Sequence, residues 1–262
     1  MLEEAGWAVQ IPAEPLCCGL TWISTGQLQT GKRILARTVA RLAEHVRGGG
    51  YVVGLEPSCT TVFRSDAAEL FPDDQDVLRL RDHTLTLAEL LAEHTPGWQP
   101  PPVRRQVLAQ VHCHQHAVLG WDADARLLSA AGATAEPLES GCCGLAGNFG
   151  FQPGHGDVSR ALAERVLLPR LRDAAPDTVI LADGFSCRTQ IHELDSGDRE
   201  AMHLAELLAY ATELPRDHPE RLAAPRPAEP TTASRLAAAG AAAGIGAGLA
   251  AGAAVAARSA MR

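Results

Sequence analysis

Two adjacent cysteines followed by glycine occur twice in this chain of 262 residues, and this repeat constrains the fold more than any other feature. The two copies are Cys17-Cys18-Gly19 and Cys142-Cys143-Gly144. A Ser-Cys pair follows each doublet, with Cys59 lying 41 positions after Cys18 and Cys187 lying 44 positions after Cys143. The seventh cysteine, Cys113, precedes the second doublet. The repetition predicts an internal duplication of one structural unit.

Composition excludes several classes of protein. The net charge of −8 argues against a nucleic-acid partner, because such a partner requires a basic stripe. The first residues, Met1-Leu2-Glu3-Glu4, lack the basic and apolar regions of a signal peptide. We therefore expect a cytoplasmic protein, in which clustered cysteines are typical of metal ligands or redox groups and not of a disulfide framework.

Hydrophobic periodicity predicts alternating helices and strands in both halves of the chain. In the first half we expect the last turn of a helix at 2–6, strands at 7–11 and 51–55, and helices at 27–47, 60–71 and 84–94. In the second half we expect strands at 107–113 and 178–182, and helices at 122–131, 157–173 and 200–211.

The segments 52–61 and 179–189 resemble each other: each has an apolar strand, an acidic residue, a Ser-Cys pair and a nearby threonine. Continuous apolar runs are typical of buried parallel strands, and ligands collect at the carboxyl ends of such strands. The predicted fold class is α/β, with two duplicated parallel-sheet units at 1–95 and 103–214 and a proline-rich linker between them. The first unit has no counterpart of Cys113, so we expect it to be incomplete and the chain to begin inside a longer module.

Residues 215–262 are predicted to form a Pro/Arg linker and a low-complexity, Ala/Gly-rich tail. Within 236–257 there is no charge, and Gly240, Gly244, Gly248 and Gly252 fall on one face of a helix. This spacing fits a helix-packing pattern in a membrane, which would give a weak, peripheral association with the inner face of the cell membrane. A low-complexity tail would look similar, and both interpretations stay open.

Four cysteines of the second unit are the candidate cofactor ligands: Cys113, Cys142, Cys143 and Cys187. Two follow strand ends and two lie in a loop, so they are expected to converge at one edge of a parallel sheet. Thiolates in contact repel each other, and their convergence therefore indicates a metal centre. Four thiolates suit an iron–sulfur cluster or zinc, and the short peptide between adjacent cysteines favours the wider, multi-iron cluster.

Two further groups leave alternatives open. The first-unit cysteines, Cys17, Cys18 and Cys59, are predicted to be metal ligands by the same pattern, or to be buried thiols without a cluster. Three histidines surround Cys113, and alternation along a strand would place His112, His114 and His116 on the face opposite it. They either orient a cofactor and pass protons or are structural.

These motifs resemble the cysteine-rich CCG domain family. The likeness covers roughly residues 5–212 and rests on Leu16–Trp22, Glu56–Cys59, Cys142–Gly150 and Gly184–Cys187. The family has tandem copies in a subunit of heterodisulfide reductase, the glycolate oxidase iron–sulfur subunit, the anaerobic glycerol-3-phosphate dehydrogenase small subunit and bacterial lactate-utilisation proteins. The chain is most similar to the C-terminal part of fused FAD-binding and Fe–S-binding oxidoreductases that oxidise D-2-hydroxy acids.

The resemblance implies a 4Fe-4S-type cluster and an oxidoreductase module. The module would relay electrons from a flavin-linked D-2-hydroxyacid dehydrogenase, of the D-lactate or glycolate type, to a quinone or thiol acceptor. FAD would then reside on a partner or on a missing upstream domain, and the module would not be catalytic alone. The sequence departs from the family because both Cys-x-x-Cys elements lack the final thiol: Val62 and Phe63 follow Cys59, and Gln190 follows Cys187. Alternative hypotheses are a structural zinc or scaffold domain that binds a partner, and a truncated product without function.

Overall fold

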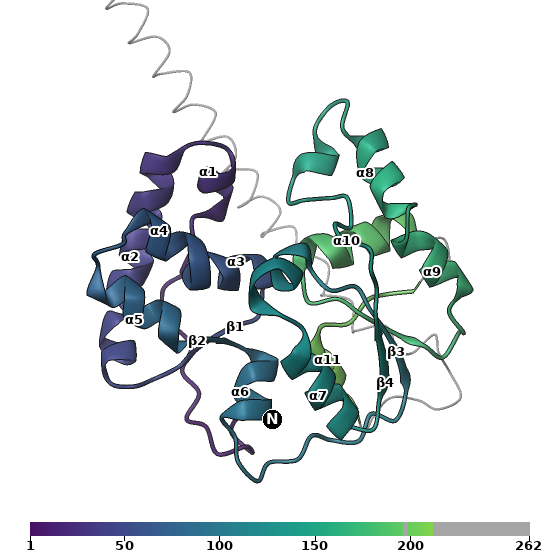
Figure 1. The fold of residues 1–262 in the computed structure, drawn as a ribbon, viewed down its shortest axis with the longest axis horizontal. Helices are drawn as coiled ribbons and strands as arrows, with labels where there is room; N and C mark the ends of the chain where they lie inside the picture. Colours follow the sequence, from purple (N-terminus) through teal and green to yellow (C-terminus); the bar gives the residue numbers. More distant parts are fainter. Residues whose placement is uncertain (196–198, 212–262) are drawn as a thin grey trace, which may run out of the picture. The chain divides into compact units, whose positions relative to one another are not determined.

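Two parallel β-sheets, one in each half of the duplicated pattern, organise the computed structural model, which describes residues 1–195 and 199–211 (Figure 1). The first sheet pairs β1 (Val52–Gly54) with β2 (Thr84–Thr86), with Val52 opposite Thr84. The second has the order β4 (Thr134–Pro137), β3 (Gln106–Ala109), β5 (Val179–Leu181). All these pairings are parallel. The predicted α/β class is confirmed.

Helices cover the two sheets. The first half contributes α1 (Leu20–Ser24), α2 (Leu28–Arg47), α3 (Pro57–Thr61), the π-helical turn η1 (Val62–Asp66), α4 (Ala67–Leu70), α5 (Gln75–His83) and α6 (Leu87–Glu93). The second half contributes the π-helical η2 (Gln115–Leu119), α7 (Asp122–Ala130), the 3-10 turn η3 (Phe149–Phe151), α8 (Gly156–Ala163), α9 (Leu167–Asp173), α10 (Phe185–Leu194) and α11 (Leu204–Ala209).

Helix α2 shows how the sequence makes these elements. Its buried apolar residues Leu35, Val39, Leu42 and Val46 recur every three or four positions and form one face. The helix ends at Arg47, and Gly49 then adopts a left-handed φ of 85° that lets the chain turn toward β1. The predicted helix at 27–47 is thus confirmed.

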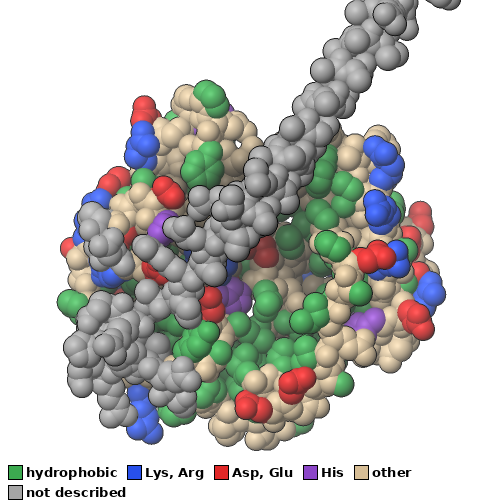
Figure 2. All heavy atoms as spheres, turned by 180° about the vertical axis from the view of Figure 1, so that it is seen from behind, with side chains coloured by type: hydrophobic (Ala, Val, Ile, Leu, Met, Phe, Trp, Pro, Cys, Tyr) green, Lys and Arg blue, Asp and Glu red, His purple; other side chains and the backbone are tan. Residues whose placement is uncertain are grey.

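One of three hydrophobic clusters is shared by the two halves. Residues of α6, including Leu87 and Leu91, pack in the same buried cluster as Leu127 and Leu128 of α7 and Val107 of β3. A second cluster lies under α9 and α10 and includes Cys143 and Cys187, and a third lies under α2 and includes Cys18. In the space-filling view, hydrophobic side chains gather near the centre of one face and charged side chains lie around it (Figure 2).

Several predicted elements differ in the structure. Residues 7–11 form no strand, and Ile11 is 88% exposed. Trp7 anchors this segment instead, because its Nε1 donates to Thr95 Oγ1 at 2.9 Å and its ring meets the ring of Tyr51 edge-on. Residues 2–6 make a hydrogen-bonded turn that ends at Gly6, whose φ is 91°.

Two predicted helices have different bounds because of local chemistry. The helix expected at 84–94 begins only at Leu87, because Thr84–Thr86 pairs with β1 and Thr86 forms a capping box with Glu89. The helix expected at 157–173 breaks between Ala163 and Leu167, since Pro169 has no N–H for the carbonyl four residues earlier. Helices α1, α5 and α10 were not predicted.

The predicted strand at 107–113 ends at Ala109, so Cys113 does not lie on a strand. Beyond the strand, Gln110 N donates to Leu181 O at 2.8 Å, and His116 N donates to His112 O at 2.9 Å in a helical turn. No helix in the described part of the chain is long and apolar enough to cross a membrane. The segment 236–257 lies outside the described residues, as do 215–235 and 258–262, and the unit boundaries at 95 and 103 stay predictions.

The shared core gives a stability prediction. Leu128 is fully buried between the two halves, and Leu128→Ala removes apolar contacts and leaves a cavity. We expect the free energy of unfolding to fall by about 2–5 kcal/mol, measured by urea denaturation. The matched control is Leu28→Ala, because Leu28 is 46% exposed and its truncation should change the unfolding midpoint little. Equal losses in the two variants would contradict a core shared by both halves.

Candidate metal centre

Four cysteines meet beyond the carboxyl ends of the second sheet. Cys113 begins the helical turn after β3, Cys142 and Cys143 lie in the loop after β4, and Cys187 lies in the first turn of α10, after β5. Because the three strands are parallel, their carboxyl ends share one edge of the sheet. The topology thus delivers thiols from three separate segments to one place.

The four thiols lie close enough to influence one another's ionisation in series. Cys142 raises the pKa of Cys113 and of Cys143, and Cys187 raises the pKa of Cys143 further. Cys143 and Cys187 are buried, whereas Cys113 and Cys142 are partly exposed. The four cysteines therefore lie at one edge of the sheet, with Cys113 and Cys142 the more exposed, and their role as ligands of one metal centre stays a prediction.

Charge in this series concentrates on Cys142. Hydrogen bonds from the thiols of Cys113 and Cys143 hold the pKa of Cys142 far below its ordinary value, and the Gly144 N–H adds to the effect. The pKa values of partly exposed Cys113 and buried Cys143 are raised because each donates to Cys142 and is partly removed from water. These shifts favour the thiolate at Cys142, and a cationic centre would offset the repulsion among several thiolates.

The glycine of each doublet has a steric and an electrostatic role. Gly144 has a φ of 101°, its N–H donates to Cys142 Sγ at 3.3 Å, and a Cβ there would lie 2.2 Å from Ser159 O. Gly19 has a φ of 81°, its N–H donates to Cys17 Sγ at 3.4 Å, and a Cβ would lie 2.9 Å from Gly31 O. The third position of both motifs therefore admits only glycine without rearrangement.

Gln190 takes over a structural role at the position of the absent thiol. Its buried Nε2 donates to Cys143 O at 3.1 Å, to Ser159 O at 3.2 Å and to Ser159 Oγ at 2.9 Å. These contacts hold the doublet loop against α8. In the first half, the corresponding position holds Val62, which is fully buried in the core under α2. The sequence showed only that the final cysteine of each Cys-x-x-Cys element is absent, and it predicted no function for Gln190.

The histidines lie differently from the prediction. His112 and His114 stack with 5.2 Å between ring centroids, and His114 Nδ1 lies 3.9 Å from Cys113 Sγ. The expectation that they face away from Cys113 is wrong, because this segment is a helical turn and not a strand. Ligand atoms of His112, Cys113 and His114 all lie within 4.8 Å of one another. His116 is exposed.

Glycine also makes room for His112. This imidazole is 6% exposed, and its Nδ1 accepts from the His114 N–H at 3.2 Å. A Cβ at Gly184 would lie 2.2 Å from His112 Cδ2, so the ring fills the space that a side chain at the start of α10 would need. Burial lowers the pKa of His112, which favours the neutral ring.

The first-half cysteines form a smaller group. Cys18 Sγ lies 3.1 Å from Cys59 Sγ, and Cys17 is exposed. The hydrogen bond from Cys59 lowers the pKa of Cys18 to about 7, whereas Cys59, which donates it, has a raised pKa. The structure therefore brings Cys18 and Cys59 together, and the role of the first-half cysteines as metal ligands stays a prediction.

One carboxylate joins the starts of the two cysteine-bearing helices. Glu56 Oε1 accepts from Ser58 Oγ at 2.7 Å at the start of α3, which carries Cys59. Its Oε2 accepts from the Phe185 N–H at 2.7 Å at the start of α10, which carries Cys187. The sequence identified Glu56 only as the acidic residue after a strand, because a bond across 129 positions has no local signature.

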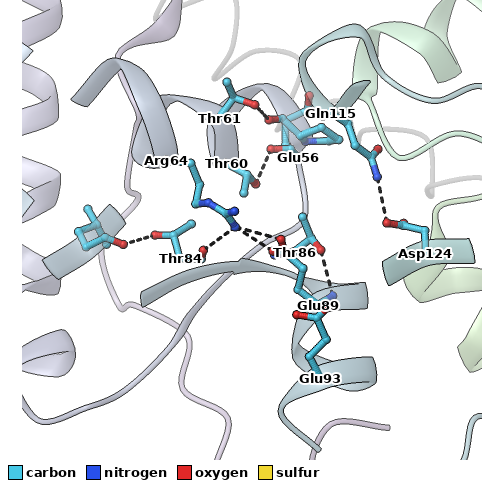
Figure 3. Close-up of polar contacts among 12 residues, drawn as sticks. Glu56, Thr60, Thr61, Arg64, Thr84, Thr86, Glu89, Glu93, Gln115 and Asp124 are labelled. Carbon is cyan, nitrogen blue, oxygen red and sulfur yellow. Dashed lines mark hydrogen bonds and ion pairs between the residues drawn. The ribbon is translucent and has the colours of Figure 1, made fainter. Parts of the chain in front are cut away.

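Further polar contacts, drawn with Glu56 in Figure 3, hold the helices of both halves in place. Arg64 of η1 donates to Thr84 O at 3.2 Å and pairs with Glu89 at 2.9 Å, which ties the helix after Cys59 to the cap of α6. In the second half, Gln115 Nε2 donates to buried Asp124 at 3.1 Å. The turn that follows Cys113 is thereby fixed to α7.

Comparison with known proteins identifies the family. The cysteine-rich domain model named CCG matches residues 1–64 and 122–192, which together make up just over half of the chain. The chain belongs to the CCG cysteine-rich domain family, and the resemblance inferred from the motifs is confirmed.

Curated relatives show the same likeness over most of the chain. Lactate utilization protein A of Bacillus velezensis is 28% identical over 221 residues, covering 79% of this chain and 89% of the relative. One subunit of the anaerobic glycerol-3-phosphate dehydrogenase of Escherichia coli is 28% identical over 217 residues, covering 80% and 53%. One subunit of the fumarate reductase (CoM/CoB) of Methanothermobacter marburgensis is 27% identical over 221 residues, covering 80% and 42%. The chain thus spans most of the first relative and about half or less of the others.

The doublet glycine gives a second prediction. Gly144→Ala should lower the free energy of unfolding by about 1–3 kcal/mol more than Gly141→Ala, measured by urea denaturation. Both glycines have positive φ, but a Cβ meets Ser159 O at Gly144 and nothing within 4 Å at Gly141. Gly141→Ala thus controls for backbone strain alone. Equal destabilisation would show that the close approach to α8 is unimportant.

Asp124 gives a prediction of pH dependence. Burial raises its pKa from 3.8 to about 8, so the folded chain holds the proton that the unfolded chain releases. The resulting stability is complete below pH 3.8 and is lost as the pH rises through about 8. Asp124→Asn should therefore show a smaller fall in unfolding free energy over this range, and the exposed Asp122→Asn should keep the wild-type slope. An unchanged slope in Asp124→Asn would refute the assignment.

Proposed function

We propose that this chain is an iron–sulfur electron-transfer component of an oxidoreductase, with Cys113, Cys142, Cys143 and Cys187 as the ligands of a 4Fe-4S-type cluster. The observation that carries the proposal is that these four cysteines all follow the carboxyl ends of the parallel strands β3, β4 and β5. Membership of the CCG family and the dehydrogenase or reductase names of two relatives support it.

The donor set suits such a group. Thiolates are the usual ligands of iron–sulfur clusters, and a site with several metal atoms accepts adjacent residues such as Cys142 and Cys143 more readily than a single tetrahedral ion does. Two of the four side chains are buried and two are partly exposed. This arrangement protects one side from water and leaves the other accessible to an electron donor or acceptor.

The cluster, when bound, would supply one-electron transfer, and the residues of this chain would set its environment. The Gly144 N–H is directed at Cys142 Sγ and would stabilise negative charge on that sulfur. Gln190 holds the backbone of Cys143 in place, and Glu56 fixes the start of the helix that carries Cys187. The nonpolar residues packed against Cys143 and Cys187, among them Leu145 and Ile191, exclude water.

We further propose that the electron donor is a flavin-linked D-2-hydroxyacid dehydrogenase of the D-lactate or glycolate type. FAD would be bound by that partner or by another domain, and the acceptor would be a quinone or a thiol. The name of the lactate utilization relative, which this chain covers over 89% of its length, supports the choice of substrate class. The other two relatives are named as subunits, which supports a partner protein.

A second candidate function is a structural zinc domain that binds a partner. The observation that favours it is the compact group of His112, Cys113 and His114, whose ligand atoms lie within 4.8 Å of one another. Two imidazoles and a thiolate are common zinc ligands. In this case Cys142, Cys143 and Cys187 would be buried or partly buried thiols without iron.

Metal analysis of the full chain, purified without oxygen, distinguishes the two functions. We expect iron and acid-labile sulfide in stoichiometric amounts, with the broad visible absorption of iron–sulfur proteins. Cys142→Ser should abolish that absorption, because Cys142 is the central sulfur of the series. Cys17→Ser, at the equivalent position of the first doublet, should retain it. Zinc in stoichiometric amount without iron would refute the cluster proposal.

A further inference from the structure

The first-half cysteine pair differs chemically from the second-half group. Cys18 Sγ and Cys59 Sγ are 3.1 Å apart, and Cys17, the adjacent residue in the doublet, points its sulfur toward the Gly19 N–H. In the second half, four cysteines follow the ends of three neighbouring strands. In the first half, one close sulfur-sulfur contact joins two thiols, which makes the pair a dithiol.

The surroundings of this pair suit thiol–disulfide chemistry. Cys18 is 5% exposed, Cys59 is partly exposed, and both pack in the nonpolar cluster with Leu35, Val39 and Val62. A small oxidant therefore has access from the Cys59 side, whereas a large reductant does not reach Cys18. Closing the 3.1 Å separation to a disulfide bond of about 2.05 Å needs a sulfur movement of about 1 Å, which side-chain rotation supplies.

The backbone on both sides of the pair is fixed. Cys18 precedes Gly19, whose carbonyl accepts from the Trp22 and Ile23 N–H groups in the first turn of α1 and whose Cα lies against Gly31 of α2. Cys59 lies in α3, whose start Glu56 holds through Ser58. The two sulfurs therefore stay neighbours in the folded chain, which raises the rate of reaction between them over that with other thiols.

We propose that Cys18 and Cys59 form a redox-active dithiol that peroxide converts to an intramolecular disulfide, separately from the second cysteine group. One thiol reduces hydrogen peroxide to water and becomes a sulfenic acid. The neighbouring thiol then attacks the sulfenic sulfur, the S–S bond forms and a second water leaves. Two thiols thus lose two protons and two electrons, and one peroxide yields two waters. Oxidation of either sulfur first gives the same product.

This inference does not rest on the proposed cluster. The 3.1 Å separation of the two sulfurs and the fixed backbone on both sides of the pair carry it. A thiol–disulfide couple in the first half would give the chain a two-electron site beside the proposed one-electron site. The bond would also tie the loop before α1 to α3.

Peptide mapping tests the proposal in the full chain. Trypsin places Cys17 and Cys18 in residues 1–32 and Cys59 in residues 48–64, whereas the second-half cysteines fall in 106–126, 127–160 and 173–188. The anaerobic protein is treated with one equivalent of hydrogen peroxide, alkylated and digested without reductant. We expect a cross-link between 1–32 and 48–64 that dithiothreitol removes.

Matched variants assign the bond. Cys17→Ser should keep the cross-link in full, and Cys18→Ser and Cys59→Ser should each lose it, with circular dichroism confirming that each variant is folded. In the wild type the oxidised form should show a higher urea midpoint than the reduced form, because the bond restrains the unfolded chain. A cross-link that persists in Cys18→Ser would overturn the assignment. So would the absence of any cross-link to residues 48–64. Metal that stays bound to Cys18 and Cys59 would also overturn it. Iron content and visible absorption are measured in parallel, so that failure of the cluster proposal is recognised separately.

Discussion

The gathering of four cysteines at the carboxyl edge of a parallel sheet is the constraint on which the rest of the structure depends. Sulfur groups held this closely repel each other once ionised, and the buried part of the site offers no water to screen that repulsion. Hydrogen bonds to sulfur reduce this repulsion. One of them comes from the backbone, where the Gly144 N–H donates to Cys142 Sγ. A cationic centre would complete this balance, and the loop, the glycine and Gln190 serve to hold its ligands.

The two halves repeat the same local structure around their cysteines, with differences. Both doublets use a glycine in a left-handed conformation whose N–H meets the first sulfur, and both Ser-Cys pairs begin a helix after a strand. The halves differ in what replaces the lost cysteine: Val62 extends a nonpolar core, and Gln190 builds a polar contact to the doublet loop. Glu56 then joins the two halves at the starts of α3 and α10.

Features with a local origin could be predicted from the sequence. The periodicity of α2, the apolar strand β5 and the grouping of cysteines behind parallel strands all follow from spacing, and each agrees with the structure. Features decided by distant partners could not. Thr84 and Thr86 belong to a segment with a helical pattern, but in the structure they pair with β1. Trp7 belongs to a segment with a strand pattern, but its side chain is hydrogen-bonded to Thr95. The contact between Glu56 and Phe185 and the role of Gln190 also depend on residues far away in the chain.

The positions of the histidines at the site also could not be predicted from the sequence. Their predicted orientation rested on a strand that ends at Ala109, four residues before Cys113. The helical turn that follows brings His114 to the same side as the sulfur and leaves His112 packed on Gly184. Sulfur and imidazole groups therefore lie together in one small region, and the two sets of possible ligands would favour different metals.

X-ray absorption at the iron and zinc edges of the anaerobic full chain tests this account most directly, because it reports the metal and the atoms bound to it together. The account predicts iron in a shell of sulfur with a second iron nearby. Zinc bound by imidazole nitrogen and a single sulfur, with no iron signal, would contradict it.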